Sequence, residues 1–298
     1  MQKLNLTDLK LNLTDLLGAY YHHENDMTLS GRYFWNRKRF QVADLVRKNI
    51  HIFSSLYGED REFKCVDIGC GTGVDLLLIR QLLKPHFTQS EFIGLEGNQV
   101  HYELSNLRKK YFNLDDIKFK IVDLTIELPF DDNSVDFVYC SEVVEHILEP
   151  EKLLEEISRI LQPNGVFVLT TPNEPNIFQK AFWFSSARSR LKNQIKELKD
   201  NPRVFQMNGK DICVYGHVSC RKNKEWDKLL ENEGLSLIDY RRGAVVYGGT
   251  EFHDRNFMLA LKFVLETFLD VLPKQLTRDF SCQLIALYQL QREKIEKS

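Results

Sequence analysis

The 298-residue chain lacks the features that mark several classes of protein. None of its six cysteines forms a CxxC pair, which argues against a zinc ribbon or a redox motif and favours reduced thiols. The first residues, Met1 to Leu17, carry Asn, Thr, Asp and Lys where a signal peptide would have an apolar core. We therefore expect a cytoplasmic protein.

An excess of charge of one sign is also absent. The chain has 40 Lys and Arg against 42 Asp and Glu, a formal net charge of -2, so no global positive field points to nucleic acid. The longest apolar stretch, Phe257 to Leu272, is interrupted by Lys262, Glu266 and Asp270, which predicts an amphipathic helix and no transmembrane segment. The hydrophobic content of 43% suffices for one large α/β domain with additions.

The most informative stretch of the sequence is KCVDIGCGTG, from Lys64 to Gly73. It predicts a buried strand that runs into three glycines at alternate positions, followed by a helix from Val74. Glycine lets a ligand approach the main chain closely, and a helix N-terminus attracts anionic groups. The pattern predicts an α/β domain with a cofactor at the tip of its first strand.

A second candidate site residue follows the next predicted strand, Glu91 to Leu95. Glu96 lies 23 positions after Gly73, a distance at which an acidic side chain can accept both hydroxyls of a ribose. An ordinary surface carboxylate is the plainer interpretation, but the position at a strand tip favours ribose binding.

The run from Lys64 to Asn173 resembles the class I S-adenosylmethionine (SAM) methyltransferases, of the ubiquinone-biosynthesis type. Asp67 to Gly73 is similar to their motif I, D-x-G-x-G-x-G, rather than to the G-x-G-x-x-G of dinucleotide sites. Glu142 to Ile147 matches E-x-x-E-H-I, Leu161 to Gly165 matches L-x-P-x-G, and Thr171 to Asn173 matches T-P-N. The resemblance implies a Rossmann-like α/β fold with a seven-stranded, mostly parallel sheet, an antiparallel last strand, and helices on both faces.

The resemblance also implies SAM as the cofactor, with S-adenosylhomocysteine as the product. This chain has a matching residue at each cofactor-binding position of the family: the glycine loop, the acidic residue that binds ribose, the acidic residue that binds adenine, and the residues behind the cofactor. The implied cofactor-binding residues are Asp67, Gly69, Cys70, Gly71, Gly73, Glu96, Gly97, Asn98, Asp123, Leu124, Ser141 and Glu142.

The domain organisation that we expect has four parts. Residues 1–60 form an N-terminal helical lid, 61–173 the SAM-binding core, and 174–215 an insertion that caps the substrate. Residues 216–298 complete the sheet, with a helical insertion at about 241–280 and a last strand from Ser281 to Leu290. In the lid, a helix from Arg37 to Leu56 is predicted to turn its apolar side chains inward: Phe40, Ala43, Val46, Ile50 and Phe53.

Two histidines are candidate general bases, because histidine titrates near neutrality. His146 can equally be a structural residue of its helix, and His217 a turn residue bonded to backbone. A sharper alternative joins Glu142, Glu145 and His146, which share one helix side, with His217 as a divalent-metal site. Small-RNA 2′-O-methyltransferases resemble that arrangement, and such a site would suit magnesium or manganese.

The interpretation that we favour is methyl transfer from SAM to an oxygen or nitrogen of a small molecule, of natural-product, lipid or glycan type. One alternative is a metal-assisted RNA 2′-O-methyltransferase, which needs a basic face; the basic cluster from Arg188 to Lys210 is interleaved with acids and is more simply a solvated helix face. The other is a non-catalytic scaffold with the same fold. The Leu-rich N-terminus and the helix from Phe257 to Leu272 leave room for a homodimer or a membrane-surface contact.

Overall fold

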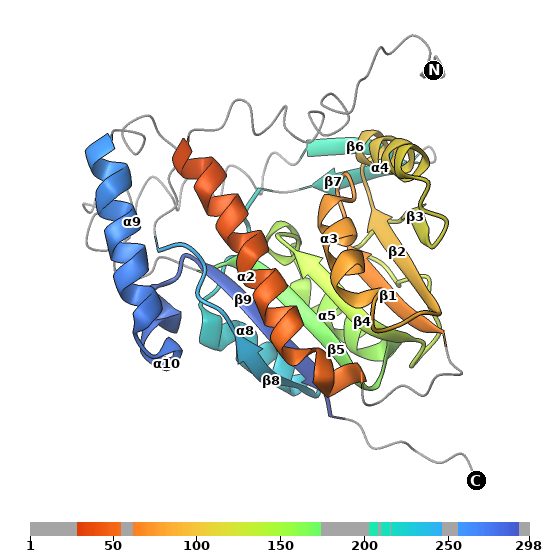
Figure 1. Ribbon diagram of the computed structural model, residues 1–298. Helices are drawn as coiled ribbons and strands as arrows, with labels where there is room; N and C mark the ends of the chain where they lie inside the picture. The colour runs from red at the N-terminus through yellow and green to blue at the C-terminus, as the bar shows by residue number, and fades with distance from the viewer. Residues whose placement is uncertain are drawn as a thin grey trace.

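The computed structural model describes residues 29–54, 62–173, 203–207, 210–214, 216–245 and 256–291. Its centre is a seven-stranded sheet of order β3-β2-β1-β4-β5-β9-β8 (Figure 1). The strands are β1 (Phe63–Ile68), β2 (Ser90–Glu96), β3 (Ile117–Ile121), β4 (Val135–Ser141), β5 (Leu161–Pro172), β8 (Leu235–Tyr240) and β9 (Gln283–Leu290).

The sheet has the predicted topology. β1 to β5 pair in parallel, whereas β9 is antiparallel to both β5 and β8. The order reverses between β1 and β4, and ligands of open α/β sheets bind at such a switch point, beyond the carboxyl ends of the strands. The fold class expected from the sequence is confirmed.

Helices cover both faces of the sheet because its inner strands are apolar on both sides. On one face, α5 (Pro150–Ile160) and α8 (Asn223–Asn232) pack on Val66 and its neighbours, with Trp226 fully buried. On the other face, α2 (Leu29–Ser54) and α3 (Val74–Leu83) pack on Cys65 and its neighbours. α4 (Gln99–Phe112) connects β2 to β3. Two separate apolar cores therefore hold the sheet in place.

The inward face of α2 differs from the prediction. Val46 is buried and Ala43 and Ile50 are half-buried, but Phe40 is 70% exposed, and the side chain of Phe53 lies outside the described residues. The face that docks on the sheet is partly polar, since it includes the buried Lys38. The spacing of apolar residues alone therefore predicted the wrong side of the helix for Phe40.

The residues Pro163-Asn164-Gly165 lie inside β5. The register of β4 and β5 jumps from the pair Val135–Leu161 to the pair Phe137–Val166, and Asn164 has a φ of 65°. These residues thus form an irregularity within β5, between its first residue and the part that pairs continuously with β4.

The remaining elements lie outside the sheet. Residues 174–202 of the predicted cap lie outside the described residues, and the described part of the cap is a hairpin of β6 (Arg203–Met207) and β7 (Lys210–Val214) near α4 (Figure 1). The insertion at 241–280 holds α9 (Asn256–Val271), α10 (Lys274–Thr277) and the 3-10 turn η3 (Arg278–Phe280). Among the helices described, none has the length and apolarity to cross a bilayer.

Candidate active site

The glycine loop between β1 and α3 is built to receive a ligand. Gly69, Gly71 and Gly73 have φ values of 69°, 54° and 80°, which side chains other than glycine rarely adopt. A Cβ on Gly69 would stand 2.4 Å from Val143, whereas a Cβ on Gly71 would meet no atom within 4 Å. Gly71 therefore faces open space at the mouth of the loop.

Two acidic residues flank this loop. Glu96, at the end of β2, accepts hydrogen bonds from the backbone N–H of Gly71 at 2.8 Å and of Asn98 at 2.7 Å. Asp67 is 1% exposed, and its Oδ2 has no hydrogen-bond partner. Burial raises the pKa of Asp67 well above its usual value, and the neighbouring Asp75 and Glu96 raise it further, against the opposing effect of Lys38. A buried carboxylate oxygen without a hydrogen-bond partner is energetically costly, and a ligand that donates a hydrogen bond to it would remove that cost.

The other predicted cofactor residues lie around the same strand ends. Asn98 caps α4 by accepting from the N–H of Val100 at 2.9 Å. Asp123, after β3, accepts from the N–H and hydroxyl of Thr125 through Oδ1. Gly97 lies near the Val122 carbonyl, just after β3, and Leu124 packs on the apolar core. Cys70 is buried, and this burial raises the pKa of its thiol.

Lys38 of α2 enters the site from the lid, and the sequence interpretation missed it. Its ammonium is 3% exposed, donates to Asp75 Oδ2 at 3.1 Å and Ser141 Oγ at 2.7 Å, and lies 4.9 Å from the Trp35 ring. Burial alone would lower the pKa of Lys38, but Asp75, Glu142 and Asp67 raise it above its usual value. In the sequence, Lys38 stands in an Arg-Lys-Arg run that looks like a solvated helix face, so no pattern singled it out.

Glu142 interacts electrostatically both with Lys38 and with the predicted catalytic residue His146. It has a φ of 56°, and its Oε1 accepts from Thr170 Oγ1 and from Gln283 Nε2, each at 3.1 Å. Burial raises the pKa of Glu142, although Lys38 and its hydrogen bonds oppose the shift. Ser141 Oγ also pairs with Thr170 Oγ1 at 2.8 Å. The carboxyl end of β4 is thus linked to β5 and β9.

Glu145, His146 and His217 gather beyond Glu142. Their ligand atoms all lie within 4.8 Å of one another, because the N–H groups of Val218 and Ser219 donate to the Glu145 carbonyl and hold the His217 segment on this turn. The two imidazole rings meet edge to face at 4.9 Å. The three residues could hold a divalent cation, whereas the Glu142 carboxylate is not part of this group.

The surroundings disfavour a charge on His217 and on Glu145. Burial, together with the neighbouring His146 ring, lowers the pKa of His217 to about 4. Glu145 is fully buried, Thr171 Oγ1 donates to its Oε2 at 3.0 Å, and its Oε1 has no hydrogen-bond partner. Burial and Glu142 raise the pKa of Glu145 well above its usual value. His217 is therefore neutral near pH 7, and its lowered pKa makes it a weak base.

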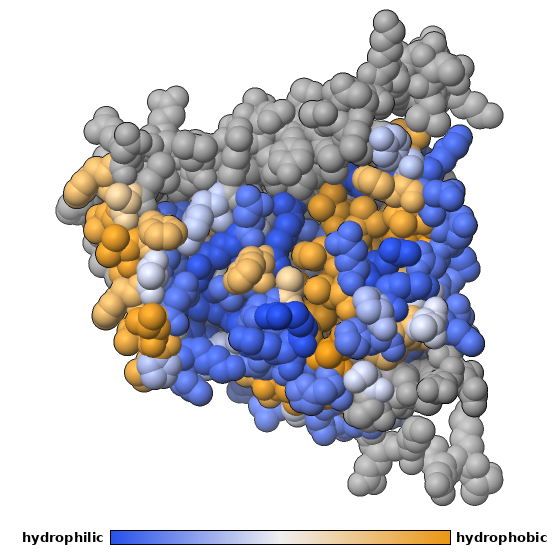
Figure 2. Space-filling view, viewed as in Figure 1, coloured by the Kyte–Doolittle hydropathy of each residue, from blue (hydrophilic) through white to orange (hydrophobic). Residues whose placement is uncertain are grey.

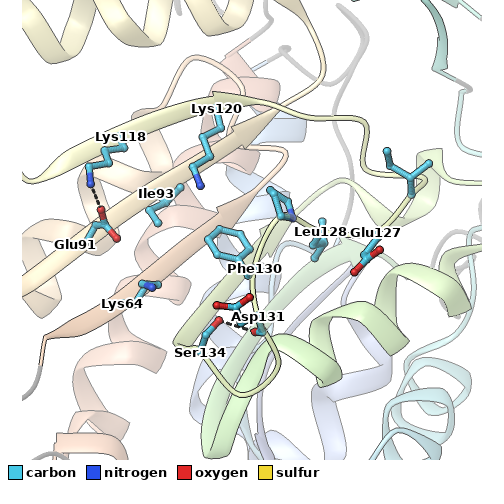
Figure 3. Close-up of a pocket in the computed structure, with 12 residues that line it drawn as sticks. Lys64, Glu91, Ile93, Lys118, Lys120, Glu127, Leu128, Phe130, Asp131 and Ser134 are labelled. Atoms are coloured by element: carbon cyan, nitrogen blue, oxygen red, sulfur yellow. Dashed lines mark hydrogen bonds and ion pairs between the residues drawn. The ribbon is translucent and has the colours of Figure 1, made fainter.

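A separate groove of about 750 Å³ opens at the other end of the sheet, where β1 and β2 begin (Figure 3). The connection from β3 to β4, residues 122–134, contains no helix, and its Phe130 faces Lys120, whose ammonium lies 5.0 Å from the ring. Lys118 pairs with Glu91 across the strands. None of the predicted site residues lines this groove.

Comparison with known proteins agrees with this geometry. A family model described as "Methyltransferase domain" matches residues 59–234. Cycloartenol-C-24-methyltransferase 1 of Oryza sativa subsp. japonica is 25% identical over 204 residues, 65% of this chain and 54% of its own length. Sterol 24-C-methyltransferase of Candida albicans is 26% identical over 168 residues, 54% of this chain and 43% of its own length.

The chain therefore spans about half the length of the curated relatives that it matches. Among solved structures, a candidate sarcosine dimethylglycine methyltransferase from Galdieria sulphuraria superposes with a TM-score of 0.53 at 18% identity. The match covers 94% of this chain and 98% of that protein. At this identity the likeness concerns the fold alone.

Proposed function

This chain belongs to the methyltransferase domain family, and on that premise we propose that it transfers a methyl group from SAM to a small, largely apolar acceptor. One observation carries the proposal. The unpartnered Asp67 Oδ2, the Glu96 carboxylate and the open space above Gly71 meet at the carboxyl ends of β1 and β2. A cofactor with an ammonium group supplies the donor that Asp67 Oδ2 lacks, and the hydroxyls of a ribose diol can donate to the remaining lone pairs of the Glu96 carboxylate.

The residues present fit SAM. Asp67 and the glycine loop would hold its methionine end, Glu96 its ribose, and Asp123 with Leu124 its adenine. Four further buried polar atoms that lack a partner are carried by residues of the loop, α2, the turn after β4 and β9: Trp35 Nε1, Thr72 Oγ1, Glu145 Oε1 and Gln283 Oε1. Where such atoms line a binding site, a bound ligand can complete their hydrogen bonds.

When bound, SAM supplies an electrophilic methyl group for an in-line displacement. The chain's own residues bind the cofactor and the acceptor, orient them and exclude water. These effects provide most of the rate enhancement in such a reaction. Lys38 offsets the negative charge of Asp75, Asp67 and Glu142 beneath the site. His146 and His217 are the candidates to accept a proton from an acceptor that carries one, and the pKa of about 4 makes His217 a weaker base at neutral pH than an ordinary histidine.

The acceptor class rests on the relatives and on the chain. The relatives are named for methylation at C-24 of cycloartenol and of sterols, so we add carbon to the oxygen and nitrogen acceptors that the sequence suggested. RNA 2′-O-methylation gains no support from these relatives. The trio of Glu145, His146 and His217 favours a metal-assisted version of small-molecule methylation, which a loss of activity in EDTA and its recovery with Mn²⁺ would support.

The test is calorimetric titration of S-adenosylhomocysteine into the wild type, Glu96→Gln and Glu91→Gln. Both glutamates lie on β2 and are mostly buried, at 12% and 16% side-chain exposure, but only Glu96 reaches the glycine loop. Because hydrogen bonds to a charged group contribute about 1.5–3 kcal/mol, we expect Glu96→Gln to weaken binding roughly 10–100-fold. Glu91→Gln should bind like the wild type.

A second step follows labelled methyl transfer from SAM into a lipid extract and, separately, into RNA. Label in an apolar lipid fraction supports the proposal, and label in RNA alone contradicts the acceptor class. No binding of S-adenosylhomocysteine at all would overturn the activity and favour the non-catalytic scaffold.

A further inference from the structure

Helix α9 turns Glu266 toward the protein and most of its large apolar side chains outward. Glu266 is 1% and Leu269 4% exposed, while six large apolar residues of the same helix are 50–76% exposed. Figure 2 shows hydrophobic side chains gathered over α9 and α10, which Figure 1 places at one side of the molecule, away from β1 to β4. A surface helix normally shows the opposite arrangement.

Buried ion pairs hold the helix in this orientation. Arg242 donates to Glu266 Oε2 and to Asp270 Oδ1, each at 2.5 Å, and Glu266 Oε1 accepts from the N–H of Val245 at 2.6 Å. Arg37 of α2 donates to Asp270 Oδ1 at 2.6 Å. Because removing one partner of a buried ion pair leaves the other charge uncompensated, these bonds strongly oppose a rotation that would turn the apolar face inward.

The exposed residues form a regular stripe. Phe257, Leu261, Val264, Phe268 and Val271 follow one another at spacings of four, three, four and three residues. This is the a/d spacing with which two helices pack knobs into holes. Phe263 widens the stripe, Leu276 of α10 extends it, and the Thr267 hydroxyl is satisfied by the Phe263 carbonyl at 2.8 Å.

The size of this face matches a protein interface. From the fraction of each side chain that is exposed, and with about 150–250 Å² per aromatic side chain, the seven apolar residues offer on the order of 800 Å². That area exceeds the roughly 300–600 Å² of the largest apolar patch on a typical monomer. It also equals the approximately 800 Å² that each partner buries in a standard interface.

We propose that this face is the interface of a homodimer in which α9 of one chain packs on α9 of a second copy about a two-fold axis. The charges near the stripe favour a second copy over an anionic membrane. The ammonium of Lys262 lies over the Tyr33 ring, Lys274 pairs with Asp239, and Arg278 pairs with Asp227. The described residues near α9 thus direct their cations to the protein itself, whereas interfacial membrane helices present them to the lipid.

The experiment is sedimentation equilibrium of the full chain from nanomolar to micromolar concentration, on the wild type, Leu261→Glu and Phe268→Glu. Phe40→Glu is the matched control, because Phe40 is an isolated, 70% exposed phenylalanine on α2, outside the stripe. Each substitution occurs twice in a two-fold interface, so we expect the stripe variants to raise the dimer dissociation constant at least about 100-fold. The control should leave it unchanged, and all variants should keep the wild-type circular dichroism spectrum.

A concentration-dependent dimer that only the stripe variants dissociate supports the proposal. A monomer at every concentration overturns it, and so does a dimer that all three variants leave intact. Co-sedimentation of a monomer with phosphatidylcholine and phosphatidylserine vesicles, lost in the stripe variants, would assign the face to a membrane instead. The oligomeric state is read without cofactor or acceptor, so its outcome is independent of the methyl-transfer assay.

Discussion

The cation that α2 inserts below the glycine loop gives the sharpest prediction. Lys38→Met keeps an unbranched apolar side chain that is one atom shorter, and it removes the ammonium that contacts Asp75 and Ser141; the Lys38 side chain is 3% exposed. The substitution therefore isolates the effect of one buried positive charge on the stability of the fold.

The expected loss of unfolding free energy follows from two observations. Removing one partner of a buried ion pair costs about 3–5 kcal/mol, and Arg39 still holds Asp75 at 2.9 Å in the variant, so the lower end applies. Burial raises the pKa of Asp75, but Lys38 and Arg39 outweigh it and lower the pKa to about 2 from an ordinary 3.8. That shift corresponds to about 2.5 kcal/mol, and we expect Lys38→Met to cost about 3 kcal/mol.

The assay is urea unfolding of the ligand-free protein at pH 7 for Lys38→Met, Asp75→Asn and the double variant. Lys118→Met is the control, since Lys118 is 60% exposed and forms a surface ion pair with Glu91 that should contribute about 0–1 kcal/mol. The double variant should cost about 2 kcal/mol less than the sum of the single variants, because it removes both partners of the Lys38–Asp75 pair, whereas each single variant leaves one of them behind.

The pH dependence has a defined sign. The pKa of Asp75 is lower in the folded protein, so its stabilising effect is present above about pH 4 and is lost as the pH falls towards 2. The coupling should thus be constant from pH 8 to about pH 5. If Lys38→Met costs no more than Lys118→Met, or if the double variant is additive, the buried charge does not stabilise the site as argued.

Three further predictions concern the loop, the histidine and the core. Gly71→Ala should fold but lose S-adenosylhomocysteine binding, which calorimetric titration measures. Gly69→Ala should unfold at a lower urea concentration, because its Cβ would clash with Val143, and urea unfolding measures that loss of stability. Because the folded pKa of His217 is about 4, below its ordinary value, folded protein should lose stability as the pH falls from about 6.5 to 4. His217→Asn should reduce that loss, and equal acid sensitivity of the variant would contradict the assignment. Trp226→Ala, in the core under α8, should cost about 3–5 kcal/mol of unfolding free energy, and a loss below 1 kcal/mol in thermal and urea unfolding would show that the core relaxes around the cavity.

The glycine loop and the strand tips were predictable because local sequence determines them. Asp67 and Glu96 each follow a buried run directly, and in a parallel sheet the carboxyl ends of neighbouring strands lie together. The E-x-x-E-H segment likewise placed Glu145 and His146 on one turn. The approach of His217 was predictable only through the resemblance, since its contact with Glu145 spans more than 70 residues.

The sequence could not reveal which polar residues are buried. Lys38 and Glu266 look like solvated charges, and only their partners Asp75 and Arg242, distant along the chain, make their burial favourable. For the same reason periodicity predicted the helix from Phe257 to Leu272 but not which side of it faces the protein. Phe40 is the reverse case, an apolar residue at helical spacing that the partly polar inner face of α2 leaves outside.

The position of β9 in the sheet has a consequence for how the chain folds. β9 is the last strand along the sequence, yet it lies between β5 and β8 and pairs with both. Until Leu290 has been synthesised, β5 and β8 each present an unpaired edge, and the sheet cannot close. A chain of such non-local pairings folds slowly, and nascent or truncated forms that end before Gln283 should aggregate through these edges.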